Sequence, residues 1–119
     1  MKPEADLQCK LIRYLRSNNI LCFAPCNEAF MTLATLSGKR NFGLWKHYEN
    51  MGMEKGVLDV WIFKAGKTYV IELKSPGGKL SPSQVGFIAR LEREEIPYLV
   101  TDCYYTAVDW LDSNNIIRT

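Results

Sequence analysis

The sequence predicts an α/β fold, a sandwich in which helices flank a mixed central β-sheet. The strongest signal is a pair of β-rich segments separated by four residues, which is typical of a hairpin. Helical patterns precede and follow this hairpin, and a further extended segment separates the last two. The chain has 119 residues, 47% of them apolar and 24% charged, so we expect one folded domain over residues 1–119.

The first expected element is a helix that begins near Pro3, since proline suits the first turn of a helix. Its buried stripe recurs at helical spacing and consists of Leu7, Leu11, Tyr14 and Leu15. Residues 17–19 end the pattern. Glu4 precedes Leu11 by seven residues, nearly two helical turns, so we expect Glu4 to face the body of the protein.

Residues 20–24 predict a short strand, which Pro25 stops. Residues 26–56 mix apolar, glycine and basic residues without a sustained period, and this segment is too long for a bare loop. We expect a helix around residues 29–36. A mobile, basic segment is expected after Ser37, where it would serve as an arm that faces the substrate.

Residues 57–63 and 68–74 form the predicted hairpin, because both segments are rich in β-branched and aromatic residues. The turn is expected at its centre, residues 65–66, where a glycine stands. The sequence Ser-Pro-Gly-Gly at residues 75–78 then breaks the second strand.

A helix is expected to follow, with Ser81 as its N-cap, Pro82 as its first residue, and its end at Glu94 or Glu95. One face of this helix carries Gln84, Phe87, Ile88 and Leu91.

The last two expected elements are a strand at residues 97–101 and a helix at residues 104–111, capped by Thr101 or Asp102. The resulting order is helix, strand, strand, strand, helix, strand, helix.

The hairpin register places Asp59 directly opposite Glu72, and Lys74 projects on the same face as Glu72, about 7 Å further along. Opposed like charges cost roughly 0.2–1 kcal/mol, and a divalent cation would reverse that sign. Carboxylates are the ligands that Mg²⁺ prefers, and a nearby ammonium group can stabilise developing negative charge. Phosphodiester hydrolysis needs this combination.

An alternative interpretation of the hairpin is structural. In it, Asp59 pairs with Lys74 or another surface cation, Glu72 is solvated, and the charges only protect a sheet edge.

The composition excludes several classes of protein. The net charge is +2, from 15 basic and 13 acidic residues, so any basic surface must be local. The candidate cations are Lys39, Arg40, Lys46, His47, Lys55, Lys74 and Lys79. The apolar runs are too short to span a bilayer and the N-terminus lacks a signal-peptide core, which predicts a cytoplasmic protein without membrane contact. The four cysteines are expected to be reduced, and Cys22, Cys26 and His47 lack the usual zinc spacing.

Three segments surround the predicted site: KGVLDV at residues 55–60, IELK at 71–74 and GKLSPSQ at 78–84. Together they resemble the VRR-Nuc branch of the PD-(D/E)XK nucleases, and the resemblance extends over nearly the whole chain. It implies a restriction-endonuclease-like sandwich, formed here by a single stand-alone VRR-Nuc domain. The family commonly has proline before its first catalytic aspartate, where this chain has Leu58. We expect Leu58 to face away from the site and to pack in the core.

The resemblance also implies roles for individual residues. The catalytic set is Asp59, Glu72, Lys74 and Gln84, and the ligands of Mg²⁺, or of Mn²⁺ as a substitute, are Asp59, Glu72, the carbonyl of Leu73, and Glu4. Asn27 would lie near the site. The residues expected to contact the substrate are Asn27, Lys39, Arg40, Lys55 and Lys79.

The implied function is that of a metal-dependent DNA endonuclease, similar to virus-encoded homodimers that cut branched DNA such as four-way junctions. Residues 42–53, rich in aromatic residues and methionine, are the candidate dimer interface. A virus-encoded member would act in the cytoplasm of a bacterial host. The alternatives are a non-catalytic nucleic-acid-binding module of the same fold and a structural or interaction protein.

Overall fold

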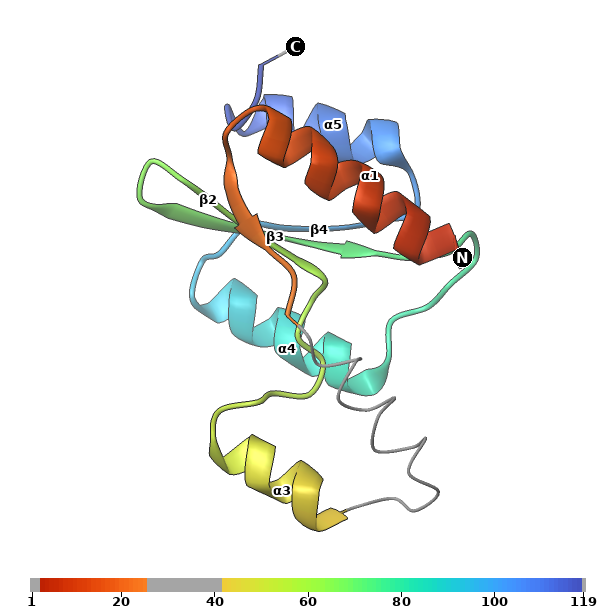
Figure 1. The fold of residues 1–119 in the computed structure, drawn as a ribbon, viewed down its shortest axis with the longest axis vertical. Coiled ribbons are helices and arrows are strands. Elements are labelled where there is room, and N and C mark those ends of the chain that lie inside the picture. The colour runs from red at the N-terminus through yellow and green to blue at the C-terminus, as the bar shows by residue number, and fades with distance from the viewer. Residues whose placement is uncertain (1–2, 26–41, 119) are drawn as a thin grey trace.

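The centre of the protein is a four-stranded mixed sheet (Figure 1). The structure is a computed structural model and describes residues 3–25 and 42–118. Its strands, in order across the sheet, are β1 (Leu21–Phe23), β2 (Val60–Lys64), β3 (Lys67–Leu73) and β4 (Tyr98–Thr101). The pairs β1–β2 and β2–β3 are antiparallel, and β4 joins β3 in parallel. The predicted mixed sheet is therefore confirmed.

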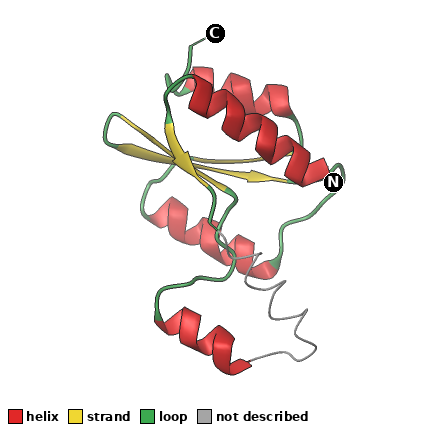
Figure 2. Cartoon of the chain, in the orientation of Figure 1, coloured by secondary structure: helices red, strands yellow, loops and turns green. Residues whose placement is uncertain are grey.

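Helices cover both faces of this sheet (Figure 2). They are α1 (Pro3–Ser17), α3 (Phe42–Asn50), α4 (Pro82–Arg93) and α5 (Tyr104–Ser113). In the figures α1 and α5 lie over one face and α4 over the other, with α3 beyond α4. This arrangement confirms the predicted α/β sandwich and is consistent with a restriction-endonuclease-like fold. No helix in the described part of the chain has the length and apolar character needed to cross a membrane.

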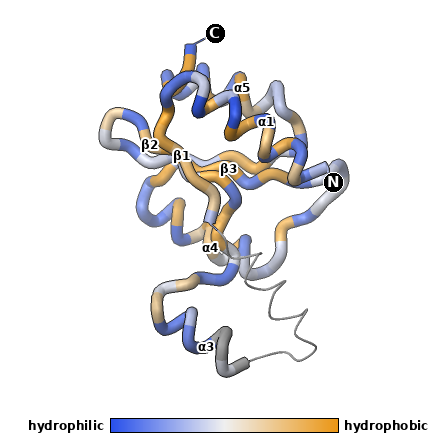
Figure 3. The backbone as a smooth tube through the Cα atoms, viewed as in Figure 1, coloured by the Kyte–Doolittle hydropathy of each residue, from blue (hydrophilic) through white to orange (hydrophobic). Residues whose placement is uncertain are grey.

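Two apolar clusters hold the layers together. One joins α1 and α5 to the sheet, with Leu11, Leu15 and Leu111 fully buried. The other joins α4 to the opposite face and includes Leu58 and Val70, both fully buried. Hydrophilic and hydrophobic segments alternate along α1 and α4, as one-sided burial requires (Figure 3).

The β2–β3 hairpin has the predicted register. Val60 pairs with Ile71, and Lys64 pairs with Lys67 at the turn. Ala65 and Gly66 have φ of 51° and 79°, and two positive φ values are what a tight type I′ turn requires. The strand predicted from residue 57 begins only at Val60, so residues 57–59 lead into the sheet as a loop.

Most element boundaries agree with the prediction within one or two residues. The helix expected at residues 29–36 lies outside the described residues. The prediction of a mobile segment after Ser37 is wrong for residues 42–50, because these residues form α3. Phe42, Trp45 and Tyr48 recur every three residues, and this was the helical signal in a segment that otherwise shows no sustained period.

The cap predicted for the last helix is also wrong. Cys103 occupies the N-cap of α5 and makes no side-chain capping bond. The hydroxyl of Thr101 instead accepts a hydrogen bond from the N–H of Cys103, at 3.1 Å. Thr101 is the last residue of β4, so its hydroxyl serves the turn between strand and helix.

Candidate active site

Asp59 and Glu72 lie side by side where β2 begins and β3 ends. The N–H of Asp59 donates to Oε1 of Glu72 at 3.2 Å, and the N–H of Leu73 donates to Oδ2 of Asp59 at 2.9 Å. Asp59 and Glu72 are the chain neighbours of Val60 and Ile71, the last residue pair of the hairpin ladder. The structure thus brings the two predicted acids together.

Glu72 is the buried charged residue of the described chain, with 2% of its surface exposed. Its Oε2 atom lies 3.1 Å from Nζ of Lys74. Burial raises the pKa of the Glu72 carboxyl above its ordinary value, while the Lys74 charge and the hydrogen bonds from Lys74, Asp59 and Gln84 partly oppose that rise. The alternative in which Glu72 is solvated is therefore wrong.

Gln84 connects the acid and the lysine to helix α4. Its Nε2 donates to Oε2 of Glu72 at 2.8 Å, and its Oε1 accepts from Nζ of Lys74, also at 2.8 Å. Both ends of the amide are therefore committed to the site, and they fix the relative positions of the acid and the ammonium group.

The position of Gln84 comes from a capping box at the start of α4. The N–H of Gln84 donates to Oγ of Ser81 at 3.2 Å, and the N–H of Ser81 donates to Oε1 of Gln84 at 3.0 Å. Pro82 follows the N-cap, as predicted. The contribution of Ser81 to holding Gln84 was not predicted, although the S-x-x-Q spacing contains that signal.

Glu4 reaches the same end of the sheet from α1. Its Oε1 accepts a hydrogen bond from the N–H of Ser75 at 3.1 Å, just after β3. The prediction that Glu4 faces the body of the protein is confirmed. Its role as a metal ligand stays a prediction.

The loop before Asp59 packs against α4, and this packing constrains Gly56 and Leu58. Gly56 has a φ of +79°, and a Cβ atom at this position would lie 2.2 Å from the carbonyl oxygen of Ser83 in the first turn of α4. Only glycine permits so close an approach. Leu58 is fully buried in the cluster beneath α4, as predicted for the residue that replaces the common proline.

The donor set suits a hard divalent cation. Two carboxylates and the carbonyl of Leu73 are oxygen donors, and Mg²⁺ commonly binds one or two protein carboxylates and keeps several waters. Within residues 3–25 and 42–118, no group of three or more His, Cys, Asp or Glu is placed to hold a metal ion. An ion held by these donors would take its remaining ligands from water and phosphate.

The predicted substrate contacts are only partly covered by the structure. Lys55 and Lys79 are exposed on the loops before β2 and before α4. Asn27, Lys39 and Arg40 lie outside the described residues, as does Cys26. The remaining cysteines are free thiols, as expected, at positions Cys9, Cys22 and Cys103.

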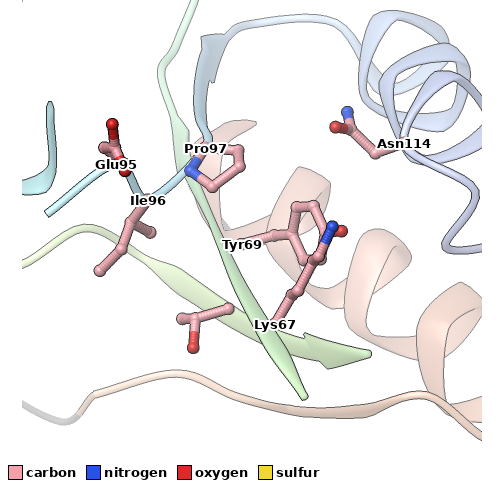
Figure 4. A pocket seen from close by; sticks show the side chains of 7 residues that line it. Lys67, Tyr69, Glu95, Ile96, Pro97 and Asn114 are labelled. Carbon is pink, nitrogen blue, oxygen red and sulfur yellow. The ribbon is translucent and has the colours of Figure 1, made fainter. Parts of the chain in front are cut away.

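An open hollow of about 400 Å³ lies at the opposite end of β3 (Figure 4). Its lining is made by Lys67, Thr68, Tyr69, Glu95, Ile96, Pro97 and Asn114. Tyr69 and Lys74 are five strand residues apart, roughly 16 Å, so the hollow is separate from the acid pair. Its lining contains one carboxylate, Glu95, and no paired acids.

A comparison with protein families matches the VRR-NUC domain over residues 28–103, more than half of the chain. Comparisons with curated proteins and with solved structures find no match. The matched segment contains Asp59, Glu72, Lys74 and Gln84, the four side chains that the structure gathers at one end of the sheet. The chain is therefore a member of the VRR-NUC family of nucleases.

Proposed function

We propose that this protein is a Mg²⁺-dependent deoxyribonuclease that hydrolyses phosphodiester bonds. The supporting observation is the contact between Asp59 and Glu72, with Lys74 3.1 Å from the buried Glu72 carboxylate. Membership of a nuclease family supports DNA as the partner. The cytoplasmic location expected from the sequence stays a prediction.

Asp59, Glu72 and the carbonyl of Leu73 would hold the ion, with Glu4 as a further candidate from α1. Bound there, Mg²⁺ supplies Lewis acidity for the phosphate and offsets the like charges of the two acids. Lys74 donates hydrogen bonds toward the attacking water and stabilises the negative charge that develops on the phosphate. Gln84 keeps the ammonium group of Lys74 in place through the 2.8 Å hydrogen bond.

The direct test measures cleavage of a panel of labelled DNA structures with Mg²⁺ or Mn²⁺. We expect Asp59→Asn and Glu72→Gln to abolish cleavage while folding and DNA binding persist. Cleavage by these variants at the rate of the unsubstituted protein would contradict the proposed metal site. DNA binding without any metal-dependent hydrolysis by the unsubstituted protein would instead identify a non-catalytic binding module of the same fold.

We further propose that the enzyme prefers branched DNA, such as four-way junctions, and acts as a homodimer. The physical reason is symmetry: one domain presents one site, whereas paired cuts in two strands call for two sites related by a two-fold axis. The segment at residues 42–53, which includes α3, is the candidate interface. In the DNA panel, four-way junctions should be cut faster than linear duplexes of equal length.

A further inference from the structure

The peptide group between Leu58 and Asp59 is held at both of its polar ends. Its carbonyl oxygen, which belongs to Leu58, accepts a hydrogen bond from Nε1 of Trp61 at 3.2 Å. Its N–H, which belongs to Asp59, donates to Oε1 of Glu72, also at 3.2 Å. A peptide group is planar, and its C=O and N–H point in opposite directions. The indole on one side and the carboxylate on the other therefore define its orientation.

This peptide group precedes the sheet. The ladder of β2 with β3 begins at Val60, and the ladder of β2 with β1 begins at Trp61. The Leu58 carbonyl lies before both ladders and takes its hydrogen bond from a side chain. A backbone carbonyl that is partly removed from water needs such a partner, so the indole N–H stabilises the peptide group in the observed orientation.

The ring of Trp61 is itself held by two neighbouring rings. Trp61 is partly buried and packs against the apolar cluster beneath α4, to which Leu58 belongs. The ring of Phe23, its partner on β1, has its centroid 6.3 Å away and its plane within 14°. The ring of Phe87 on α4 meets it edge-on at 6.1 Å. Contacts from a strand and from a helix restrict the rotamer of the indole, so its Nε1 stays directed at the loop.

Both predicted metal-binding acids depend on the orientation of this peptide group. The Asp59 N–H donates to Glu72, and the Leu73 N–H donates to Oδ2 of Asp59 at 2.9 Å, so each carboxylate is bound by the backbone of the opposite segment. Rotation of the peptide group would turn its N–H away from Glu72 and would displace Asp59. The indole bond to the carbonyl also polarises the N–H at the other end, which strengthens its bond to the carboxylate.

We propose that Trp61 is a positioning residue of the metal site. Its indole N–H fixes the Leu58–Asp59 peptide group and, through it, the separation of the Asp59 and Glu72 carboxylates. This inference rests on the proposed function, which assigns the ion to these two acids. Trp61 therefore acts on metal affinity through the backbone, although it offers no ligand itself.

The first test measures backbone hydrogen bonding by amide hydrogen exchange in EDTA. Trp61→Phe keeps an aromatic ring beside Phe23 and Phe87 but removes the N–H donor. The Asp59 amide should then exchange about 2- to 10-fold faster, as expected for the loss of one hydrogen bond. The amide of Val70, which donates to the carbonyl of Pro97, should keep its exchange rate. Trp61→Tyr gives the same readout if Trp61→Phe does not fold.

The second test measures metal binding by calorimetric titration with Mg²⁺. The dissociation constant of Trp61→Phe should rise about 2- to 10-fold, and the Mg²⁺ concentration for half-maximal cleavage should rise by the same factor. Trp110→Phe is the matched control, because Trp110 meets Tyr69 edge-on at 6.0 Å in the cluster of α1 and α5. It removes an indole from the opposite face of the sheet. Its melting temperature should fall, but its Mg²⁺ affinity should equal that of the unsubstituted protein.

Three results would overturn the inference alone. The folded Trp61 variant could bind Mg²⁺ as tightly as the unsubstituted protein, or Trp110→Phe could weaken binding as much. In the unsubstituted protein, the Trp61 indole N–H could also exchange as fast as that of a free indole. Metal-dependent cleavage by the unsubstituted protein in any of these cases would leave the proposed function standing. An unsubstituted protein that binds no Mg²⁺ would overturn the proposed function and this inference together.

Discussion

Glu72 carries a carboxyl group in surroundings that favour its neutral form. Burial raises its pKa from the ordinary value of 4.5, and Lys74 and the hydrogen bonds around it only partly compensate. The folded protein therefore binds a proton at this group more tightly than the unfolded chain does. Stability from this group is present at low pH and is lost as the pH rises from 4.5 through the raised pKa.

We expect Glu72→Gln to unfold at a higher temperature than the unsubstituted protein at neutral pH in EDTA. Glutamine resembles the protonated acid, so the difference in melting temperature should be near zero at about pH 4 and should grow toward about pH 8. Circular dichroism melts across this range measure it. Addition of Mg²⁺ should narrow the gap, because the ion binds the charged acid. A gap that shrinks as the pH rises would contradict the assigned direction of the pKa shift.

Lys74 is the residue whose loss should separate hydrolysis from metal binding. Its Nζ lies 3.1 Å from Glu72 and 2.8 Å from Gln84, so it is held beside the acids and does not itself offer a metal ligand. Lys74→Ala should slow hydrolysis about 100-fold or more while metal affinity falls much less. Single-turnover cleavage and a calorimetric Mg²⁺ titration provide the two measurements. Weak metal binding with near-normal hydrolysis at saturating Mg²⁺ would reverse the assignment.

At the scale of elements, the first turn of α4 both starts a helix and holds the site. Ser81→Ala removes half of the capping box and should cost about 1 kcal/mol of stability. Gln84→Ala removes the other half of the box and also the bonds to Glu72 and Lys74. We expect it to cost a similar stability and to lower cleavage about 10- to 100-fold further than Ser81→Ala, as is usual for groups that orient active-site ligands. Urea unfolding with parallel cleavage rates measures both effects. Equal losses of cleavage in the two variants would show that Gln84 acts only by capping α4.

The contact between Gly56 and α4 gives a second prediction at this scale. Gly56→Ala would force a Cβ atom against the carbonyl oxygen of Ser83, 2.2 Å away, and would displace the turn that presents Gln84. Gly66→Ala is its matched control, because Gly66 has the same φ of +79° with no atom within 4 Å of the added carbon. The control should lose about 1 kcal/mol of stability from backbone strain alone. Gly56→Ala should lose roughly 1–3 kcal/mol more and most of its cleavage. Equal stability losses in urea would show that the close approach has no consequence.

The elements that could be predicted are those with local signals. The hairpin register follows from a turn at Ala65 and Gly66, and the start of α4 follows from Ser81 and Pro82. The N-cap of α5 was missed because the hydroxyl of Thr101 bonds within the preceding turn, a choice that depends on where β4 ends. Local propensity does not determine such boundaries.

At the scale of the whole molecule, the site forms where α1, the β2–β3 hairpin and α4 meet. Asp59, Glu72 and Lys74 could be grouped from the sequence because one hairpin carries them. The bond from Ser75 to Glu4 joins residues 71 positions apart. Such contacts depend on how the layers pack, and helical spacing could predict only that Glu4 points inward.

The proposed dimer yields the prediction that belongs to this scale. Met51 follows α3 within the candidate interface and is 70% exposed. Met51→Glu should convert a sedimenting dimer into a monomer and should replace paired cuts of a four-way junction by single nicks. Tyr105→Glu, at an equally exposed position on α5, should keep the dimer. A dimer that survives Met51→Glu but dissociates with Tyr105→Glu would move the interface to the other side of the sheet.

The double use of Gln84 also restricts which sequences this fold can carry. Capping statistics alone treat glutamate and glutamine as interchangeable at the third helical position after a serine N-cap. Here the side chain must donate a hydrogen to Glu72, and an ionised glutamate has none to give. A redesign guided by helix propensity would accept glutamate at residue 84 and would set a third carboxylate against Glu72. The site therefore requires an uncharged amide at this position, whereas capping of the helix alone would accept either residue.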